Sequence, residues 1–524
     1  MTRIFANRVH RFPCVDSRHS RALVILFLDV FGGYTSSKVA GRCDSLAGPT
    51  GWRLVDTLRK ERKLAMTSTL HNRIGLLLAL AVAVLALPNV AAAETDPNRL
   101  TPEQIAEGWI SLFDGETLFG WTPTSEANWS VAEGAISVGE GAEGFLMTNS
   151  EFADYELQLE FKAPVSTNSG VFLRTPPMPK DPAKDCYELN IAPPENDFPT
   201  GSLVFRRRRP LDDREAGSPP MKGGAREGGS QGKEISVKYS DDPGWHTFHV
   251  VADGNKLTVT LDGVELFVFE DDHAIRRGHI GLQFRQGPVA FRNIRLKPLG
   301  LKPMLNGKDL SGWNDEQKKT SEFEIVASQD LSDSLPPEGR GPDESGAEDF
   351  ALHVTNGSGQ LESDGTYGDF TMQFDTRVDG DGLNSGVFFR CIPREYMNGY
   401  ECQIHNTVKD GDPTKPADFG TGAIYRRVPA RRVNARDHEW FTTTLVATGP
   451  HIAVWVNGLQ VTDWTDPRPP HDNPRNGLRT AAGTIAIQGH DPTTNLRFQN
   501  LKISELPKNI HHNDTTDTTE SEVK

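Results

Sequence analysis

Two stretches of the chain repeat one pattern: DYELQLEFKAPVSTNSGVFLR at residues 154–174 and DFTMQFDTRVDGDGLNSGVFFR at residues 369–390. In the first stretch the apolar residues Leu157, Leu159 and Phe161 alternate with polar residues. A period of two residues is typical of a β-strand with one buried face. Both stretches continue into NSGVFLR or NSGVFFR, which a turn followed by a second strand would explain. The sequence therefore predicts one pair of strands that is used twice.

The repetition covers most of the chain, because further segments match in the same order. The matching pairs are SLFDGETLFGW (111–121) and PMLNGKDLSGW (303–313), YELNI (187–191) and YECQI (400–404), TGSLVFRR (200–207) and TGAIYRR (421–427), WHTFHVVADGNKLTVTLDG (245–263) and WFTTTLVATGPHIAVWVNG (440–458), and GHIGLQFRQGPVAFRNIRL (278–296) and GTIAIQGHDPTTNLRFQNLKI (483–503). A repeat of roughly 200 residues indicates duplicated domains rather than a solenoid. Many short strands at even spacing favour a two-sheet jelly-roll sandwich. We expect an all-β chain with sandwich domains at 108–299 and 300–507.

Composition and charge agree with this fold class. A chain of 524 residues exceeds what one hydrophobic core organises, and 49 Gly with 35 Pro fits a turn-rich β protein. The net charge is −15, and residues 1–93 hold 13 basic and 5 acidic residues, so the remainder carries about −23. Such acidity argues against nucleic acid as a partner. Two charged, Pro-rich insertions at 206–234 and 327–349 are predicted to be exposed loops, and the arginine run 206–209 is interpreted as solvated rather than ligand-binding.

The N-terminal region predicts export. A basic segment precedes the apolar run Ile74–Leu87, and Ala91 to Ala93 supply small residues at the expected cleavage site. The run is too short to span a bilayer as a helix, so we expect cleavage after Ala93, a periplasmic or extracellular protein, and no membrane span in the mature chain. Because signal peptides stand at the N-terminus, we expect a signal peptide at 66–93 with Met66 as the initiator, and residues 1–65 as a misassigned extension. In the alternative, the apolar run is an uncleaved membrane anchor that follows a long cytoplasmic tail. The polar tail 508–524 is predicted to be disordered.

Three cysteines follow the predicted cleavage site: Cys186, Cys391 and Cys402. An odd number permits at most one disulfide and leaves one thiol over. Cys391 and Cys402 flank the turn PREYMNGY at the ends of two predicted strands. In an oxidising compartment, a cross-strand disulfide between them is plausible.

Familiar catalytic motifs are absent from the sequence, so the residues that both copies share become the guide to a site. Arg174 and Arg390 lie on otherwise apolar strand faces, where an unpaired charge would be costly. Glu188 and Glu401, in YELNI and YECQI, are the expected partners on the following strand. Such a pair could belong to a sugar site, or it could be a structural ion pair.

The second copy holds polar residues that the first copy lacks. His405 closes YECQIH, two positions after Gln403, and Gln488-Gly489-His490-Asp491 stands where the first copy has Gln283-Phe284-Arg285-Gln286. Arg390, Glu401, His490 and Asp491 are therefore the candidate catalytic group, because histidines and carboxylates serve as general acids and bases. The same side chains, Glu401, His405 and His490, could instead bind a divalent metal ion.

The combination of motifs resembles the 3-keto-disaccharide hydrolase domain family. The resemblance is carried by LNGKDLSGW, NSGVFFR, GYECQI, TGAIYRR, the W-x-T segment near VNG and the closing IQGHD…RFQNLKI, and it covers nearly all of residues 108–507, twice. It implies a concanavalin-like jelly-roll sandwich fold. It also implies cleavage of glycosides that have been oxidised to a ketone at carbon 3 of the sugar.

The resemblance also implies roles for the candidates. The ketone acidifies the hydrogen on carbon 2, so a base, Glu401 or His490, could start an elimination while Arg390 and His405 hold the enolate or a metal. The remaining candidates for substrate contact are Asn384, Gln403, Gln488 and Tyr425 in the second copy and Arg174 and Glu188 in the first. The first copy departs from the pattern at the histidine positions, so we expect the second to be catalytic. The alternatives are a non-catalytic carbohydrate-binding tandem and a surface scaffold.

Overall fold

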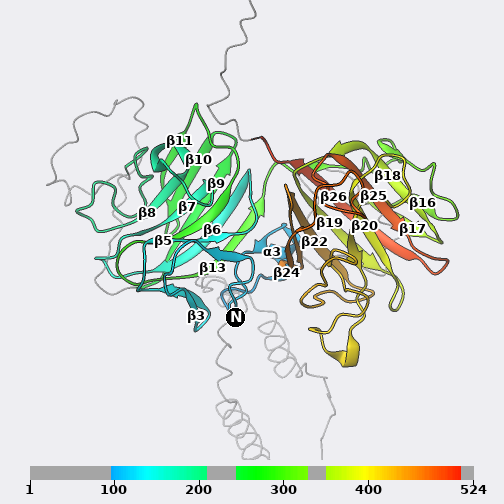
Figure 1. Ribbon diagram of the computed structural model, residues 1–524, viewed down its shortest axis with the longest axis horizontal. Helices are drawn as coiled ribbons and strands as arrows, with labels where there is room; N and C mark the ends of the chain where they lie inside the picture. The colour runs from blue at the N-terminus through cyan, green and yellow to red at the C-terminus, as the bar shows by residue number, and fades with distance from the viewer. Residues whose placement is uncertain (1–95, 209–243, 328–349, 509–524) are drawn as a thin grey trace, which may run out of the picture. The chain divides into compact units, whose positions relative to one another are not determined.

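The strands of each copy form two antiparallel sheets, and the two copies share one strand order (Figure 1). The computed structural model describes residues 96–208, 244–327 and 350–508. The first copy's eight-stranded sheet consists of β11 (Val264–Glu270), β10 (Lys256–Leu261), β9 (His246–Asp253), β6 (Tyr155–Lys162), β13 (Val289–Pro298), β4 (Ala135–Val138) and β3 (Ser130–Ala132), with β1 (Ile110–Ser111) paired to β13. Its five-stranded sheet consists of β2 (Trp121–Pro123), β5 (Gly144–Thr148), β12 (His279–Phe284), β7 (Ser169–Thr175) and β8 (Tyr187–Ile191).

The second copy repeats both sheets. Its eight-stranded sheet consists of β16 (Glu322–Ala327), β17 (Phe350–Thr355), β26 (Asn495–Glu505), β19 (Phe370–Val378), β22 (Trp440–Thr448), β23 (His451–Val456) and β24 (Leu459–Thr465), with β14 (Lys302–Pro303) paired to β26. Its five-stranded sheet consists of β15 (Trp313–Asn314), β18 (Gly359–Tyr367), β25 (Gly483–Gly489), β20 (Ser385–Cys391) and β21 (Tyr400–Ile404). Helical segments in the described part of the chain are short: α3 (Pro102–Ala106), α4 (Pro182–Asp185) and the 3₁₀ turn η2 (Lys409–Gly411). The prediction of an all-β chain with two tandem jelly-roll-type sandwiches is confirmed.

The alternation seen in the sequence decides which side of β6 is buried. Leu157, Leu159 and Phe161 are at most 1% exposed and belong to the first hydrophobic core. The intervening residues of β6 are partly exposed, and Glu160 binds the guanidinium of Arg292 at 2.7 Å. The core of each copy thus lies between its two sheets, and the opposite faces are free to carry polar groups.

Arg174 and Arg390 are placed by β-bulges. In the first copy Gly281 pairs with Phe172 and His279 with Thr175, so β7 holds an extra residue at this point. Arg174 takes the positive φ of 49°, and Arg390 at the equivalent bulge of β20 takes 48°. Both side chains turn inward between the sheets and are at most 1% exposed.

The predicted pairing of these arginines with Glu188 and Glu401 is wrong. The Arg390 guanidinium binds the Asp369 carboxylate at 3.1 Å and donates to the carbonyl oxygens of Gly368 and Gly449. Arg174 binds Asp154 in the same way. The bulge turns the arginines into the core while the glutamates lie opposite Phe172 and Phe388, on the other face of the sheet. Arg174 and Arg390 therefore join the two sheets and expose no donor to a substrate.

The disulfide between Cys391 and Cys402 that the sequence left plausible is absent from the structure, where all three described cysteines are free. Cys402 lies opposite Val387 and packs into the second core. Cys391 lies four residues further along β20 and packs against Phe388 and Met397 in a separate apolar cluster. The two sulfur atoms are therefore separated by both register and packing.

Residues of the second copy complete the core of the first. Trp455 on β23 is 1% exposed, belongs to the first hydrophobic core, and donates its indole N–H to the carbonyl oxygen of Ser111 at 2.9 Å. Ion pairs also cross between the copies, from Arg431 to Asp114 at 2.7 Å and from Arg277 to Asp369 at 2.9 Å. Trp455 is therefore a packing residue and leaves no ring for stacking on a sugar.

We expect Trp455→Phe to lower the free energy of unfolding by about 1–2 kcal/mol, because it removes a buried hydrogen bond and part of a packed ring. Equilibrium denaturation would measure the loss. Trp464→Phe, at a half-buried ring in the same sheet, is the matched control and should cost less than half as much. Equal losses for the two variants would contradict a special role for Trp455.

Several sequence predictions fall outside the described residues. These are the extension 1–65, the signal peptide 66–93, most of the two insertions and nearly all of the tail. Within the described ranges, no helix has the length and apolarity needed to cross a membrane.

Candidate functional site

The outer face of the second copy's five-stranded sheet carries two rows of side chains. Val387, Phe389 and Ile487 point into the core, so the residues between them point outward. The pairings of β18, β25, β20 and β21 place these outward residues side by side. One row is Gln360, Gln488, Gly386 and Gln403, and the other is Glu362, Ala486, Phe388 and Glu401.

Glu401 lies over the gap that Gly386 leaves in this face. A β-carbon at residue 386 would come within 2.8 Å of Oε1 of Glu401 and 2.9 Å of its Cγ. The glycine of NSGVFFR therefore does more than form a turn, because any side chain here would displace the carboxyl group. Gly170 plays the same part in the first copy, where a β-carbon would lie 3.3 Å from Oε1 of Glu188.

Hydrogen-bonding groups without partners surround this gap. The side-chain oxygens Oε1 of Gln403 and Oε1 of Gln488 are buried and have no hydrogen-bond partner among the described residues. The Gln488 amide N–H group reaches only the sulfur of Met397, at 3.3 Å, and a thioether is a weak acceptor. Buried polar groups are normally paired, so two unpaired amide oxygens beside one glycine indicate a place for a polar ligand.

The environment of Glu401 favours its protonated form. Burial raises the pKa of Glu401 to about 8, and the nearby Asp418 carboxylate adds to the rise while Arg475 and Arg426 oppose it. Asp418 is itself held in place, because its Oδ2 accepts hydrogen bonds from Asn384 at 2.7 Å and from Gln403 at 3.2 Å. A carboxyl group with a pKa near 8 carries a proton at neutral pH and can donate it.

His490 and Asp491 form a second titratable pair. Nδ1 of His490 lies 2.8 Å from Oδ2 of Asp491, and both side chains are 40% exposed. Hydrogen bonds from Thr493 and then from His490 lower the pKa of Asp491. A carboxylate at Nδ1 fixes the imidazole so that Nε2 is free to accept a proton.

His490 lies just beyond the row of Gln488, Gly386 and Gln403, and the row of Glu401 lies on the other side of that row. His490 follows β25 two positions after Gln488, and the corresponding residue of the first copy is Arg285. Arg285 lies close enough to Glu188 to oppose the effect of burial, which raises the pKa of Glu188 to about 7. Position 490 therefore corresponds to a residue whose charge acts on the equivalent carboxyl group of the first copy.

The other predicted contact residues lie around this cluster. The backbone N–H of Tyr425 donates to the carbonyl oxygen of Glu401 at 2.9 Å, and its ring packs edge-on against Phe419. His405 directly follows β21, with Nδ1 buried and unpaired among the described residues. The amide group of Asn384 binds Asp418. Glu401, Gln403, Gln488, Tyr425 and Asn384 are thus linked by register or by direct contacts.

The metal interpretation finds no support in the described ranges. They contain no group of three or more His, Cys, Asp or Glu side chains arranged to hold a metal ion. Glu401, His405 and His490 are accordingly not a ligand set in this structure.

The first copy presents a more apolar face. Phe145 and Met147 occupy the places of Gln360 and Glu362, and Phe145 packs edge-on against Phe172 at 4.6 Å. Glu188 remains, but Arg285 and Gln286 stand in place of His490 and Asp491. The two copies therefore share a buried carboxyl group and differ in the groups around it.

Arg206 does not behave as the solvated loop residue that was predicted. It binds Asp271 at 2.8 Å and lies over the ring of Tyr187 at 4.6 Å. This placement is structural, because Asp271 also accepts a hydrogen bond from the Tyr187 hydroxyl. Of the arginine run, only Arg209 lies beyond the described part of the chain.

Sequence reasoning missed Glu362, Asp418, Arg426 and Arg475. Glu362 is 2% exposed and its Oε1 accepts from Thr484 at 2.7 Å, while Oε2 is unpaired within the described chain. Aligning GFLMT (144–148) with the start of β18 would have revealed the change from methionine to glutamate. No sequence signal links Arg475 to Glu401, because it comes from a turn more than 70 residues away.

A cavity of about 740 Å³ adjoins this cluster at Asp418. Its other lining residues include Phe119 of the first copy and Phe419, Arg431 and Asp463 of the second, but neither Glu401 nor His490. We place the site on Glu401 instead, because the carboxyl group with the raised pKa and the two unpaired amide oxygens lie there.

Both copies of the chain are similar to one known protein family. The model of the 3-keto-alpha-glucoside-1,2-lyase-like domain matches residues 108–297 and again residues 300–504. A 3-keto-disaccharide hydrolase of Bacteroides thetaiotaomicron is 31% identical over 103 residues, which cover 17% of this chain and 35% of that protein. The chain thus matches about a third of that relative's length.

Solved structures with related folds include a provisionally assigned glycosyl hydrolase of Parabacteroides distasonis, with 17% identity, a TM-score of 0.30, and coverage of 38% of this chain and 99% of that one. The carbohydrate-binding module CBM66 of Bacillus subtilis has 15% identity, a TM-score of 0.23, and coverage of 34% and 95%. At these values the structural likeness adds no argument about activity.

Proposed function

Because the chain belongs to the 3-keto-alpha-glucoside-1,2-lyase-like domain family, we propose that its second sandwich cleaves 3-keto-glycosides by elimination followed by addition of water. The observation that carries this proposal is Glu401, whose carboxyl group lies over Gly386 and has a pKa raised to about 8. At neutral pH the Glu401 carboxyl group is therefore protonated, and it can donate this proton to the leaving group.

The elimination uses His490 as the general base and Glu401 as the general acid. Nε2 of His490, held by Asp491 at Nδ1, removes the proton from carbon 2 of the sugar. The C–H electron pair forms the double bond between carbons 1 and 2, the glycosidic C–O bond breaks, and Glu401 donates its proton to the departing oxygen. The ketone at carbon 3 carries the developing enolate charge, toward which the Gln488 amide N–H group can donate.

Addition of water returns both groups to their starting states. Carbon 1 of the enone product lies β to the carbonyl, so water adds there while the Glu401 carboxylate takes one of its protons. The protonated His490 gives a proton back to carbon 2. The net reaction is hydrolysis of the glycoside, without the paired nucleophile and acid of ordinary glycosidases.

Deuterium labelling would test the proposal. The purified protein is incubated in D₂O with 4-nitrophenyl 3-keto-α-glucoside and with the unoxidised parent. We expect turnover of the keto form alone, with deuterium at carbon 2 of the released sugar, because solvent exchanges with the half-exposed His490. Cleavage of the parent, or release of sugar without deuterium, would contradict the elimination.

The pKa of Glu401 predicts a pH profile. If the protonated carboxyl group is the acid, kcat/KM should fall about tenfold per pH unit above pH 8, because deprotonation removes the donated proton. A substrate with a very acidic leaving group, such as 2,4-dinitrophenol, needs no protonation and serves as the control, with no fall on this limb. A profile that rises through pH 8 for both substrates would instead make Glu401 the base.

For the first sandwich we propose sugar binding without cleavage. The supporting observation is the replacement of His490 and Asp491 by Arg285 and Gln286, which leaves no base beside Glu188. The predicted signal peptide further makes this an exported enzyme, released after Ala93, which acts on oxidised sugars outside the cytoplasm.

A further inference from the structure

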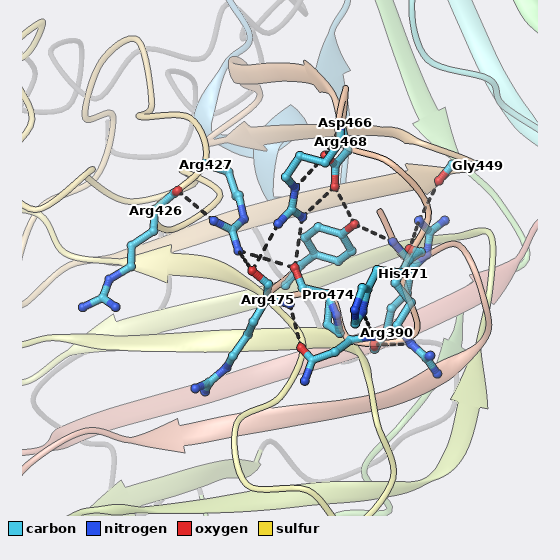
Figure 2. Close-up of polar contacts among 12 residues, drawn as sticks. Arg390, Arg426, Arg427, Gly449, Asp466, Arg468, His471, Pro474 and Arg475 are labelled. Atoms are coloured by element: carbon cyan, nitrogen blue, oxygen red, sulfur yellow. Dashed lines mark hydrogen bonds and ion pairs between the residues drawn. The ribbon is translucent and has the colours of Figure 1, made fainter. Parts of the chain in front are cut away.

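Two arginines near Glu401 and two that hold the neighbouring turn form a cluster in a strongly acidic chain. Together we call them the arginine rim: Arg426, Arg427, Arg468 and Arg475. Arg427 and Arg468 hold the turn that contains Pro474. Arg427 donates to the carbonyl oxygen of Arg475 at 2.9 Å, and Arg468 donates to the carbonyl oxygen of Pro474 at 3.0 Å (Figure 2). Asp466 neutralises Arg468 at 2.7 Å. The guanidinium groups of Arg427 and Arg468 therefore fix the turn, and the turn carries the side chain of Arg475.

Arg426 and Arg475 remain without a carboxylate partner in the described chain, where neither forms an ion pair. The Arg475 guanidinium donates to the carbonyl oxygen of Met397, and that of Arg426 lies over the Tyr425 ring at 5.2 Å. Both side chains are exposed and extend away from Asp466 (Figure 2). Both act on the Glu401 carboxyl group, which burial keeps largely protonated at neutral pH. The rim thus keeps two guanidinium groups without a carboxylate contact beside a site that also holds the Asp418 carboxylate.

Holding these charges together is costly. Burial and then the charge of Arg468 lower the pKa of Arg427, which reports repulsion between neighbouring guanidinium groups. Arg426 also takes a φ of 57°, a conformation unfavourable for a residue with a side chain. The equivalent residue of the first copy, Phe205, has a φ of 60° and is 64% exposed, so the backbone position is shared and the charge is specific to the second copy.

We propose that the arginine rim binds an anionic substituent on the leaving group of the glycoside, with Arg426 and Arg475 as its two contacts. This inference rests on the proposed function, because an acid that protonates the glycosidic oxygen must face the leaving group. Groups just beyond Glu401 therefore meet the leaving group rather than the oxidised sugar. A carboxylate suits the site well, since guanidinium groups bind its planar oxygens in pairs.

The experiment compares 3-keto-glucosides of 4-carboxyphenol, 4-hydroxybenzenesulfonate and 4-methylphenol. We expect KM for the carboxylate to be about tenfold to hundredfold below that of the neutral compound, as charge-assisted hydrogen bonds imply. The paired variant R426Q/R475Q should abolish this preference, so that the carboxylate and the neutral compound have equal KM values in the variant whatever its effect on Glu401. R436Q alters an arginine that is 80% exposed in the same sandwich, and it should keep the preference. A sulfonate preferred over the carboxylate would support the anion site and overturn the choice of carboxylate.

A binding measurement separates this inference from the proposed function. Calorimetry with the unoxidised 4-carboxyphenyl and 4-methylphenyl glucosides needs no turnover. Tighter binding of the anionic compound that weakens with added salt and disappears in R426Q/R475Q supports the rim even if no keto-glycoside is cleaved. Equal binding of the two glucosides by the unaltered protein, or a preference that survives R426Q/R475Q, would overturn it.

Discussion

Glu401→Gln should lower kcat on a 3-keto-glycoside with a poor leaving group by about 10²–10⁴-fold, the usual contribution of a general acid. Glutamine keeps the shape that Gly386 accommodates but has no proton with the required acidity. KM should change little, because the amide still fills the gap over the glycine. Steady-state kinetics with 3-keto-α-methyl glucoside would measure the effect, and the loss should shrink for a dinitrophenyl leaving group that needs no protonation.

Glu188→Gln in the first sandwich is the matched control. Glu188 lies over Gly170 as Glu401 lies over Gly386, and burial raises its pKa to about 7. If the second sandwich alone is catalytic, this variant should keep kcat within about twofold of the unaltered protein. Equal losses for the two variants would mean that both copies cleave substrate. Full activity of Glu401→Gln would contradict the assignment of Glu401 as the general acid.

Arg390→Met should destabilise the protein by about 3–5 kcal/mol, the cost of removing one partner from a buried charge pair. The change leaves the Asp369 carboxylate without one of its guanidinium partners and frees the carbonyl oxygens of Gly368 and Gly449 in a buried site. Denaturant unfolding would measure this loss. The activity of the molecules that remain folded should be close to normal, because Arg390 exposes no donor to a substrate.

Two further variants keep this prediction decisive. Arg394→Met removes a charge that is 55% exposed in the same sandwich and should change stability by less than about 0.5 kcal/mol. Asp369→Asn weakens the buried pair without leaving a cavity, so it should give a smaller loss in a protein that still folds. Unchanged stability of Arg390→Met together with a large fall in kcat would restore the catalytic role that the sequence predicted for Arg390.

The fold was predictable because its signals are local and repeated. Alternation with period two in residues 155–161 identifies a strand and its buried face without knowledge of its neighbours. The repeat identifies both sandwiches, since two sequences that match in order fold alike. The same comparison drew attention to Glu401, Gln403 and Gln488, which the structure places in adjacent positions on one sheet face. Their roles in catalysis stay a prediction.

The sequence by itself thus determined that the chain is two copies of one β-sandwich and that the second copy carries the more polar candidate site. Only the tertiary structure decided which way Arg390 points and which charges face Glu401. A β-bulge inverts the side on which a residue lies, and it arises from pairing with a distant strand rather than from local alternation. Arg475 acts on the Glu401 carboxyl group from a turn that Arg427 and Arg468 hold in place. Such placements depend on hydrogen bonds between residues far apart in the chain, which no local pattern records.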